Sequence, residues 1–244
     1  MKKITLICTL AVISNFINAQ VIPLKTFENM SMRSIGPATT SGRVTAIDAI
    51  DKANGPIYVG TASGGVWKST SAGLNWVPIF DDQEVIGIGA LKIAPSNQDV
   101  IWVGTGEGNP RNSQTSGKGI YLSLDGGKTW KKKGLEETKT IHRICVDARN
   151  ENVVFAGATG SAWGPTPDRG VYKTSNGGES WEKILFINDS VGCADLIMDP
   201  RNSNKLFAAM WQYGRHPWFF NSGGKGSGLH VTVDGGKTWK QLTK

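Results

Sequence analysis

The chain has 244 residues, of which 39% are hydrophobic and 9% aromatic, and it carries a formal net charge of +7. The mild basic excess is spread along the chain, with Lys131–Lys133 as its only run, so the composition argues against a nucleic-acid-binding protein, which needs a denser basic stripe. Beyond the N-terminus no segment is apolar enough to span a bilayer, which argues against an integral α-helical membrane protein.

The N-terminus has the pattern of a secretory signal peptide. Two lysines, Lys2 and Lys3, precede a mostly apolar stretch over residues 4–17, and Ala19 provides a small residue for cleavage. We therefore predict a signal peptide over residues 1–19 and a secreted, periplasmic or cell-surface protein; a buried N-terminal strand is the alternative. Residues 20–42 are expected to form a segment that leads into the first repeat.

An eight-residue motif of the type Ser/Thr-x-Asp-x-Gly-x-Thr-Trp occurs four times. The four copies are Ser69–Trp76, Ser123–Trp130, Thr174–Trp181 and Thr232–Trp239, and their tryptophans are 54, 51 and 58 residues apart. A repeat of this period is typical of propellers and solenoids. The second and fourth copies are nearly identical, whereas the first has Ser71 where they have aspartate.

Each copy of the motif is predicted to be a hairpin turn between two short strands. The aspartate of the second copy, Asp125, can accept hydrogen bonds from nearby backbone N–H groups, and the two glycines after it allow positive φ. The same residue at the same place in repeated units indicates a folding role, because a catalytic group is needed only once.

The sequence between the turns predicts four blades of four antiparallel strands. The blades are expected over 43–80, 88–134, 141–186 and 193–243, each with short apolar strands such as Ile101–Gly104 separated by Gly and Asn turns. No convincing amphipathic helix is present. The predicted fold class is therefore all-β, a β-propeller of four-stranded antiparallel blades.

Cys145 and Cys193 remain after the leader is removed, and the two fall out of register on different repeats. We expect two free buried thiols, although an exported chain would permit a disulfide. No group of residues has the spacing of metal ligands, and no metal or cofactor is expected.

Long loops between the second and third strands of the later blades contain the candidate functional residues. Arginines there, together with Arg43 at the start of an inner strand, could bind a carboxylate or another anion. Two acids could serve glycoside hydrolysis, and tryptophans could stack on sugars or anchor a peptide. The candidates are Arg43, Arg111, Arg169 and Arg215 for the anion, Glu107 and Asp168 for catalysis, and Trp163, Trp211 and Trp218 for stacking. Purely structural roles remain open for all three groups.

The repeated motif resembles the Asp-box, also called the BNR repeat, of sialidases, xyloglucanases and sortilin-type receptors. Phrases such as Gly104–Ser113 and Ala208–Gln212 resemble exported bacterial proteins of the sortilin N-terminal-like or BNR glycosyl-hydrolase-like type. The resemblance implies a propeller whose Asp-boxes lie on the outer rim. It also implies six or more blades, so the chain is expected to be an N-terminal part of a longer protein; a closed four-blade ring is the alternative.

The resemblance leaves two functions open. The first is a binding module for a peptide, a glycan or a partner domain; the second is a glycoside hydrolase, or the propeller part of a larger exported hydrolase. In xyloglucanases an acid stands in the first-blade turn that matches Thr61–Gly65, where this chain has Ala62. This departure favours the binding module.

Overall fold

The computed structural model describes residues 23, 25, 43–52 and 55–242. The predicted signal peptide, residues 1–19, lies outside the described residues, as does nearly all of the segment 20–42. No helix among the described residues is long and apolar enough to cross a membrane.

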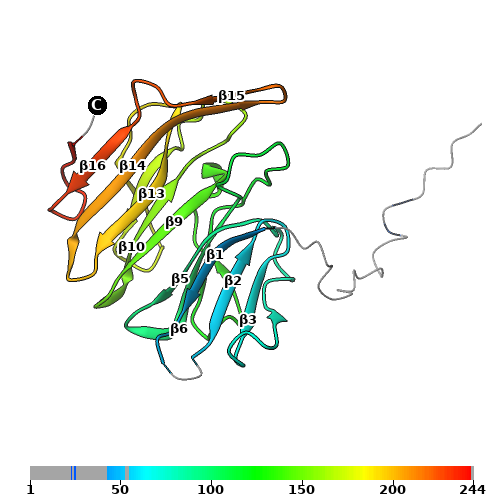
Figure 1. Cartoon of the computed structure of the whole chain (residues 1–244). Coiled ribbons are helices and arrows are strands. Elements are labelled where there is room, and N and C mark those ends of the chain that lie inside the picture. Colours follow the sequence, from blue (N-terminus) through cyan, green and yellow to red (C-terminus); the bar gives the residue numbers. More distant parts are fainter. Residues whose placement is uncertain (1–22, 24, 26–42, 53–54, 243–244) are drawn as a thin grey trace, which may run out of the picture. The chain divides into compact units, whose positions relative to one another are not determined.

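The described chain from residue 43 onward forms four antiparallel sheets, one after another along the sequence (Figure 1). The first contains β1 (Val44–Ala49), β2 (Ile57–Thr61), β3 (Val66–Ser69) and β4 (Val77–Pro78). The second contains β5 (Ile88–Ala94), β6 (Asn97–Thr105), β7 (Ile120–Ser123) and β8 (Lys131–Lys132). The third contains β9 (Ile141–Asp147), β10 (Asn150–Ala158), β11 (Gly170–Thr174) and β12 (Glu182–Leu185). The fourth contains β13 (Val191–Asp199), β14 (Asn202–His216), β16 (Gly228–Thr232) and β17 (Lys240–Gln241), with β15 (Phe219–Ser222) paired to β14.

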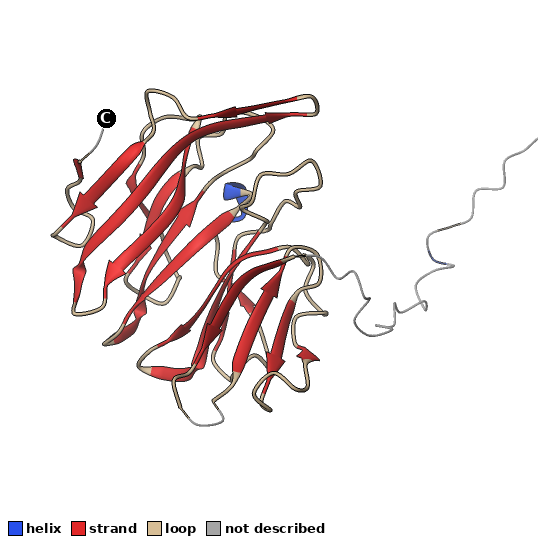
Figure 2. Cartoon of the chain, viewed as in Figure 1, coloured by secondary structure: helices blue, strands red, loops and turns tan. Residues whose placement is uncertain are grey.

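In each of these sheets the strands are paired in sequence order, as in a propeller blade, and the predicted all-β blade architecture is confirmed. Figure 2 shows the strands of all four blades, with the short 3-10 helix η3 (Glu136–Thr138) between the second and the third.

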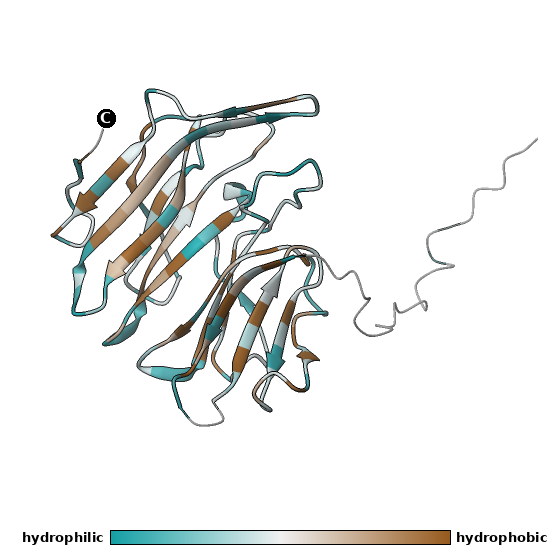
Figure 3. Ribbon diagram, in the orientation of Figure 1, coloured by the Kyte–Doolittle hydropathy of each residue, from teal (hydrophilic) through white to brown (hydrophobic). Residues whose placement is uncertain are grey.

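The blades are held together by apolar contacts between neighbouring sheets. Tyr58 and Phe80 of the first blade pack in one cluster with Ile88 of the second. A second cluster joins blades two and three, and a third joins blades three and four. Because the two middle blades are covered on both faces, β6 and β10 contain continuous runs of buried residues rather than alternating ones. Figure 3 shows the hydrophobic residues as bands across the strands.

The second copy of the repeated motif is a tight turn between β7 and β8. Asp125 accepts hydrogen bonds from the backbone N–H groups of Lys128 (3.0 Å) and Thr129 (2.9 Å), and from the Thr129 hydroxyl (2.6 Å). Ser123 accepts a further bond from the N–H of Gly127 (2.8 Å). Gly126 and Gly127 have φ of 70° and 88°, which glycine adopts without strain. The aspartate is thus a structural group of the turn.

The tryptophan that ends the motif has a second role. The indole Nε1 of Trp130 donates to the carbonyl of Ile79 (2.7 Å), and that of Trp181 donates to the carbonyl of Lys133 (2.7 Å). Both acceptors belong to the preceding blade, so the indole joins neighbouring blades in addition to covering its own hairpin. Cys145 and Cys193 are free thiols, as expected.

Replacing Asp125 by alanine should lower the melting temperature by roughly 2–4 °C, because four N–H or O–H donors of the turn, the Ser123 hydroxyl included, lose their acceptor. These hydrogen bonds lower the pKa of Asp125 from 3.8 to about 2, first of all those from Thr129. A carboxyl group whose pKa is lower in the folded than in the unfolded chain stabilises the fold at any pH above its unfolded-state pKa. This stabilisation is lost as the pH falls through the folded-state pKa. The melting-temperature difference from the wild type should therefore shrink between about pH 4 and pH 2 in calorimetric scans. A difference that stays constant over this range would contradict the ionised aspartate as the stabilising group.

Candidate functional site

The fourth blade extends beyond its sheet as a β-hairpin. β14 continues past the blade to His216 and pairs with β15, with Arg215 opposite Phe220 and Gly214 opposite Asn221. In the fourth blade, the long loop that the sequence predicts between the second and third strands is therefore largely a β-hairpin. The observed hairpin follows from side-chain alternation, since Trp211, Tyr213 and Arg215 lie on one face of the extended strand and can pack in a row.

These side chains form a continuous stack that begins and ends with a guanidinium group. Arg169 lies over the ring of Tyr213 (4.8 Å), and Tyr213 stacks on Trp211 with centroids 4.6 Å apart. Trp211 meets the edge of Phe220 at 5.7 Å, and Arg215 lies over Phe220 at 5.3 Å. Cation–π contacts of this kind contribute most where water is excluded. The stack therefore fixes two positive charges in place on either side of three aromatic rings.

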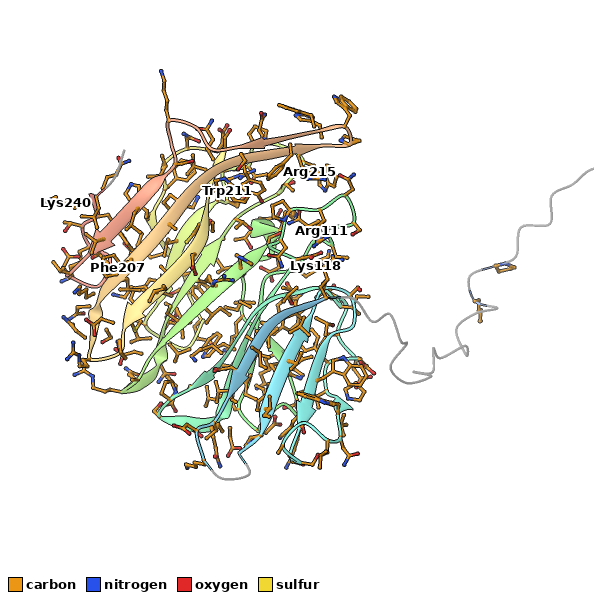
Figure 4. All side chains as sticks on the ribbon, in the orientation of Figure 1. Arg111, Lys118, Phe207, Trp211, Arg215 and Lys240 are labelled. Carbon is orange, nitrogen blue, oxygen red and sulfur yellow. The ribbon has the colours of Figure 1, made fainter. Side chains whose placement is uncertain are left out.

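Arg215 also connects the hairpin to the long loop of the second blade. Its Nε donates to Oδ1 of Asn112 (2.8 Å), and the Asn112 amide contacts the carbonyl of Pro217 (3.5 Å). Figure 4 shows Arg111 and Arg215 at the same end of the blades, with Phe207 and Lys240 toward the other end. An open cleft of about 630 Å³ is lined by residues 109–113 and Arg215. The structure thus brings Arg111 and Arg215 together in the lining of one cleft.

A second pocket, of about 400 Å³, lies between the third-blade loop and the hairpin. Trp163 and Pro165 line it from the loop, and Tyr213, Arg215 and His216 from the hairpin. The backbone N–H of Arg215 donates to the carbonyl of Ala162 (2.7 Å), which fixes the loop against the strand. Gln212, Asn221 and Ser190 add polar groups to the lining, and no carboxylate is among the described lining residues.

Large aromatic side chains are exposed in the lining of this pocket, at Trp163, and on the hairpin tip that follows its lining residue His216. Trp218 is 85% exposed, Phe219 54% and Trp163 49%. His216 stacks near both Trp218 (6.0 Å) and Phe219 (6.4 Å), so the tip of the hairpin presents a row of flat rings. An exposed aromatic cluster beside a concave pocket is the usual setting of a binding site.

Arg169 is held inside the protein, with only 1% of its surface exposed. Its guanidinium donates to three backbone carbonyls, those of Ser161, Gly164 (3.1 Å) and Ser190 (3.3 Å). Burial lowers the pKa of Arg169, against the opposing effects of Tyr213 and Asp189. These contacts make Arg169 a support of the third-blade loop, and Arg169 is also one of the residues that line the pocket.

The two candidate acids lie in different surroundings. Glu107 is fully buried and accepts two hydrogen bonds from Arg43, from Nε at 2.8 Å and from Nη2 at 2.6 Å. This ion pair links the start of β1 to the loop of the second blade. Asp168 is half-buried beside Tyr172, whose pKa is raised by burial first and by Asp168 second. Neither acid lines the 400 Å³ pocket.

A further polar cluster, which the sequence did not indicate, lies on the first strands of blades three and four. Arg143 Nε donates to Asp195 Oδ1 (2.7 Å), and Arg143 Nη1 is 3.0 Å from Nε2 of His142. Because arginine only donates, the imidazole accepts through Nε2 and carries its proton on Nδ1. Burial, followed by the charge of Arg143, lowers the pKa of His142 to about 4. Only packing of β9 against β13 brings these residues together, so no local pattern could have indicated them.

Among the described residues no three His, Cys, Asp or Glu side chains are placed to hold a metal ion.

The successive four-stranded sheets, the repeated turns and the indole contacts between sheets define an Asp-box β-propeller. The family model described as sortilin, neurotensin receptor 3 (Sortilin-Vps10) matches residues 118–244, slightly more than half of the chain. The chain therefore belongs to the sortilin family of Asp-box propellers.

Relatives among characterised proteins are xyloglucanases. An oligoxyloglucan reducing end-specific xyloglucanase of Emericella nidulans is 21% identical over 210 residues, which are 82% of this chain and 24% of that protein. A xyloglucanase of Acetivibrio thermocellus is 27% identical over 253 residues, with 91% of this chain and 27% of that protein covered. A crystal structure of an ancestral GH74 enzyme has a TM-score of 0.63 at 22% identity over 84% of this chain and 24% of that one. The chain thus spans about a quarter of the length of these relatives.

Replacing Glu107 by glutamine should lower the melting temperature by about 3 °C or more, because the buried end of the Arg43 ion pair loses its charge. Glu84→Gln is the matched control, since Glu84 is half-exposed and pairs with Lys132 at the surface. Its melting temperature should change by less than about 1 °C. An unchanged melting temperature in Glu107→Gln, measured by differential scanning fluorimetry, would contradict the structural role.

Proposed function

We propose that this chain is a carbohydrate-binding part of a larger exported propeller protein, and that it holds a glycan on the face formed by its long loops. The carrying observation is the exposed ring of Trp163 in the lining of a 400 Å³ pocket that also has amide and hydroxyl side chains. The exposed rings of Trp218 and Phe219 stack near His216, which is another lining residue. Flat apolar rings next to such polar groups suit sugar rings, which have an apolar face and a polar rim.

Recognition without cleavage is favoured by the surroundings of the acids. Glycoside hydrolysis requires two carboxyl groups on opposite sides of the scissile bond. Glu107 is fully buried and bonded to Arg43, and Asp168 does not line the pocket. The described residues therefore offer the glycan a surface to bind and no pair of acids facing that surface.

Glycoside hydrolysis remains the second candidate, because the characterised relatives are named as xyloglucanases. The chain covers only about a quarter of their length, so acids from outside this chain could complete a catalytic pair in the whole protein. A protein or peptide partner is a further occupant that the same aromatic face would fit. The leader pattern of residues 1–19 supports action outside the cytoplasm.

The decisive test measures binding of xyloglucan oligosaccharides by isothermal titration, together with release of reducing sugar. Trp163→Ala and Trp218→Ala should each weaken binding roughly tenfold, since loss of a stacking ring costs about 1–1.5 kcal/mol. The melting temperature of Trp218→Ala should stay unchanged, because this side chain is 85% exposed, and that of Trp163→Ala should change little, because about half of this side chain is exposed. Leu74→Ala is the matched control, as Leu74 is 84% exposed on a repeated turn at the other end of its blade, and its binding should equal the wild type.

Binding that survives both tryptophan substitutions would overturn the aromatic face as the glycan site. Sugar release that disappears in Asp168→Asn would instead support the hydrolase. Binding without release, in the wild type and in Asp168→Asn alike, would support the recognition module.

A further inference from the structure

Arg215 lines both the 400 Å³ pocket and the open cleft of the second-blade loop, and it presents free hydrogen-bond donors where the two meet. Its Nε is engaged by Asn112 and its plane is fixed over Phe220, so the guanidinium cannot rotate freely. Among the described residues neither of its two terminal nitrogens has a hydrogen-bond partner or an ion pair. Two such nitrogens on one rigid plane match the two oxygens of a carboxylate.

In the lining of the pocket, Arg169 adds a buried positive charge that no carboxylate among the described residues neutralises. Its guanidinium bonds only to backbone carbonyls, and its Nε has no partner. The acid that influences it is Asp189, which is exposed and lies outside ion-pair distance among the described residues. A charge held in a poorly solvated place acts more strongly on its surroundings than one in water. The pocket is therefore positive on two sides.

The described lining of the pocket contains no acid that could cancel this potential. Arg169 and Arg215 line it together with His216, and the remaining polar groups are amides and hydroxyls, such as Gln212, Asn221 and Ser190. Such a lining disfavours a positively charged ligand and favours an anionic ligand that also carries hydroxyl groups. Trp163 at the rim supplies the apolar surface for a ring.

We propose that the pocket recognises a carboxylated sugar, so that the ligand of the chain is an acidic glycan containing uronate units. The uronate carboxylate bonds to the terminal nitrogens of Arg215, its hydroxyls face the amides, and its ring lies against Trp163. This inference rests on the proposed function, because it names the kind of glycan that the loop face would hold. A peptide with a free C-terminal carboxylate would also bind Arg215, but it has no sugar ring to stack on Trp163.

The test compares two ligands that differ only in charge. Binding of hexagalacturonate and of the same oligomer with its carboxyl groups reduced to alcohols is measured by isothermal titration at low and at physiological salt. We expect the acidic oligomer to bind at least about tenfold more tightly, and Arg215→Gln to remove this preference. Salt should weaken the acidic oligomer more than the reduced one.

Arg149→Gln is the charge-matched control. Arg149 is 77% exposed and lies at the β9–β10 turn, at the opposite end of its blade from the loop that forms the pocket. It should keep the full preference for the acidic oligomer. Loss of the preference in Arg149→Gln as well would mean that net charge, and not the pocket, attracts the acid, and the inference would be wrong.

The other outcomes separate this inference from the proposed function. Equal binding of both oligomers would overturn the proposed recognition of the carboxylate and would leave the proposed glycan binding intact. Failure to bind these oligomers and xyloglucan oligosaccharides would overturn both. Tighter binding of a tetra-alanine peptide with a free C-terminus than of its amidated form, without any glycan binding, would assign the arginine to a peptide instead.

Discussion

The fold depends on contact between neighbouring blades. A four-stranded antiparallel sheet cannot bury its apolar faces by itself, so each blade needs the next one to exclude water from its core. The three apolar clusters lie at the three blade-to-blade contacts, and the indoles of Trp130 and Trp181 add a hydrogen bond from one blade to the backbone of the preceding blade. In the second and third copies the Asp-box is thus a turn that also holds its tryptophan in position for that bond.

The proposed glycan site lies at the ends of the blades that carry the long loops, opposite the ends that carry the Asp-box turns. Since the repeated turns and the long loops lie at opposite ends of each blade, loop length can change without disturbing the hairpins or the cores. Blade four uses this freedom most, because β14 continues as a hairpin and brings Trp211, Tyr213 and Arg215 into one stacked row. The row gives the exposed tip of the hairpin a rigid base.

The arginines differ in whether an acidic side chain pairs with them, and this difference separates structural arginines from candidate ligand-binding ones. Arg43 is neutralised by Glu107, and Arg143 by Asp195, so these pairs serve to link neighbouring blades. Arg169 and Arg215 have no such acid partner among the described residues, and both line the same pocket. An arginine without a carboxylate partner, next to exposed aromatic rings, is what distinguishes the proposed glycan site from the rest of the surface.

The sequence by itself determined the repeat and the turn chemistry, because the turns depend on contacts between close neighbours in the chain, such as that of Asp125 with Thr129. The four blades followed from the spacing of the repeated turns, although strands within a blade pair over longer stretches of chain, as Leu206 does with Thr232. It also indicated which loops carry arginine and tryptophan. Only the tertiary structure decided the role of each residue, because the deciding partners lie far apart in the chain. Glu107 meets Arg43 across 64 residues and Arg215 meets Asn112 across 103, so burial and pairing arise from blade packing and loop folding that no local pattern encodes.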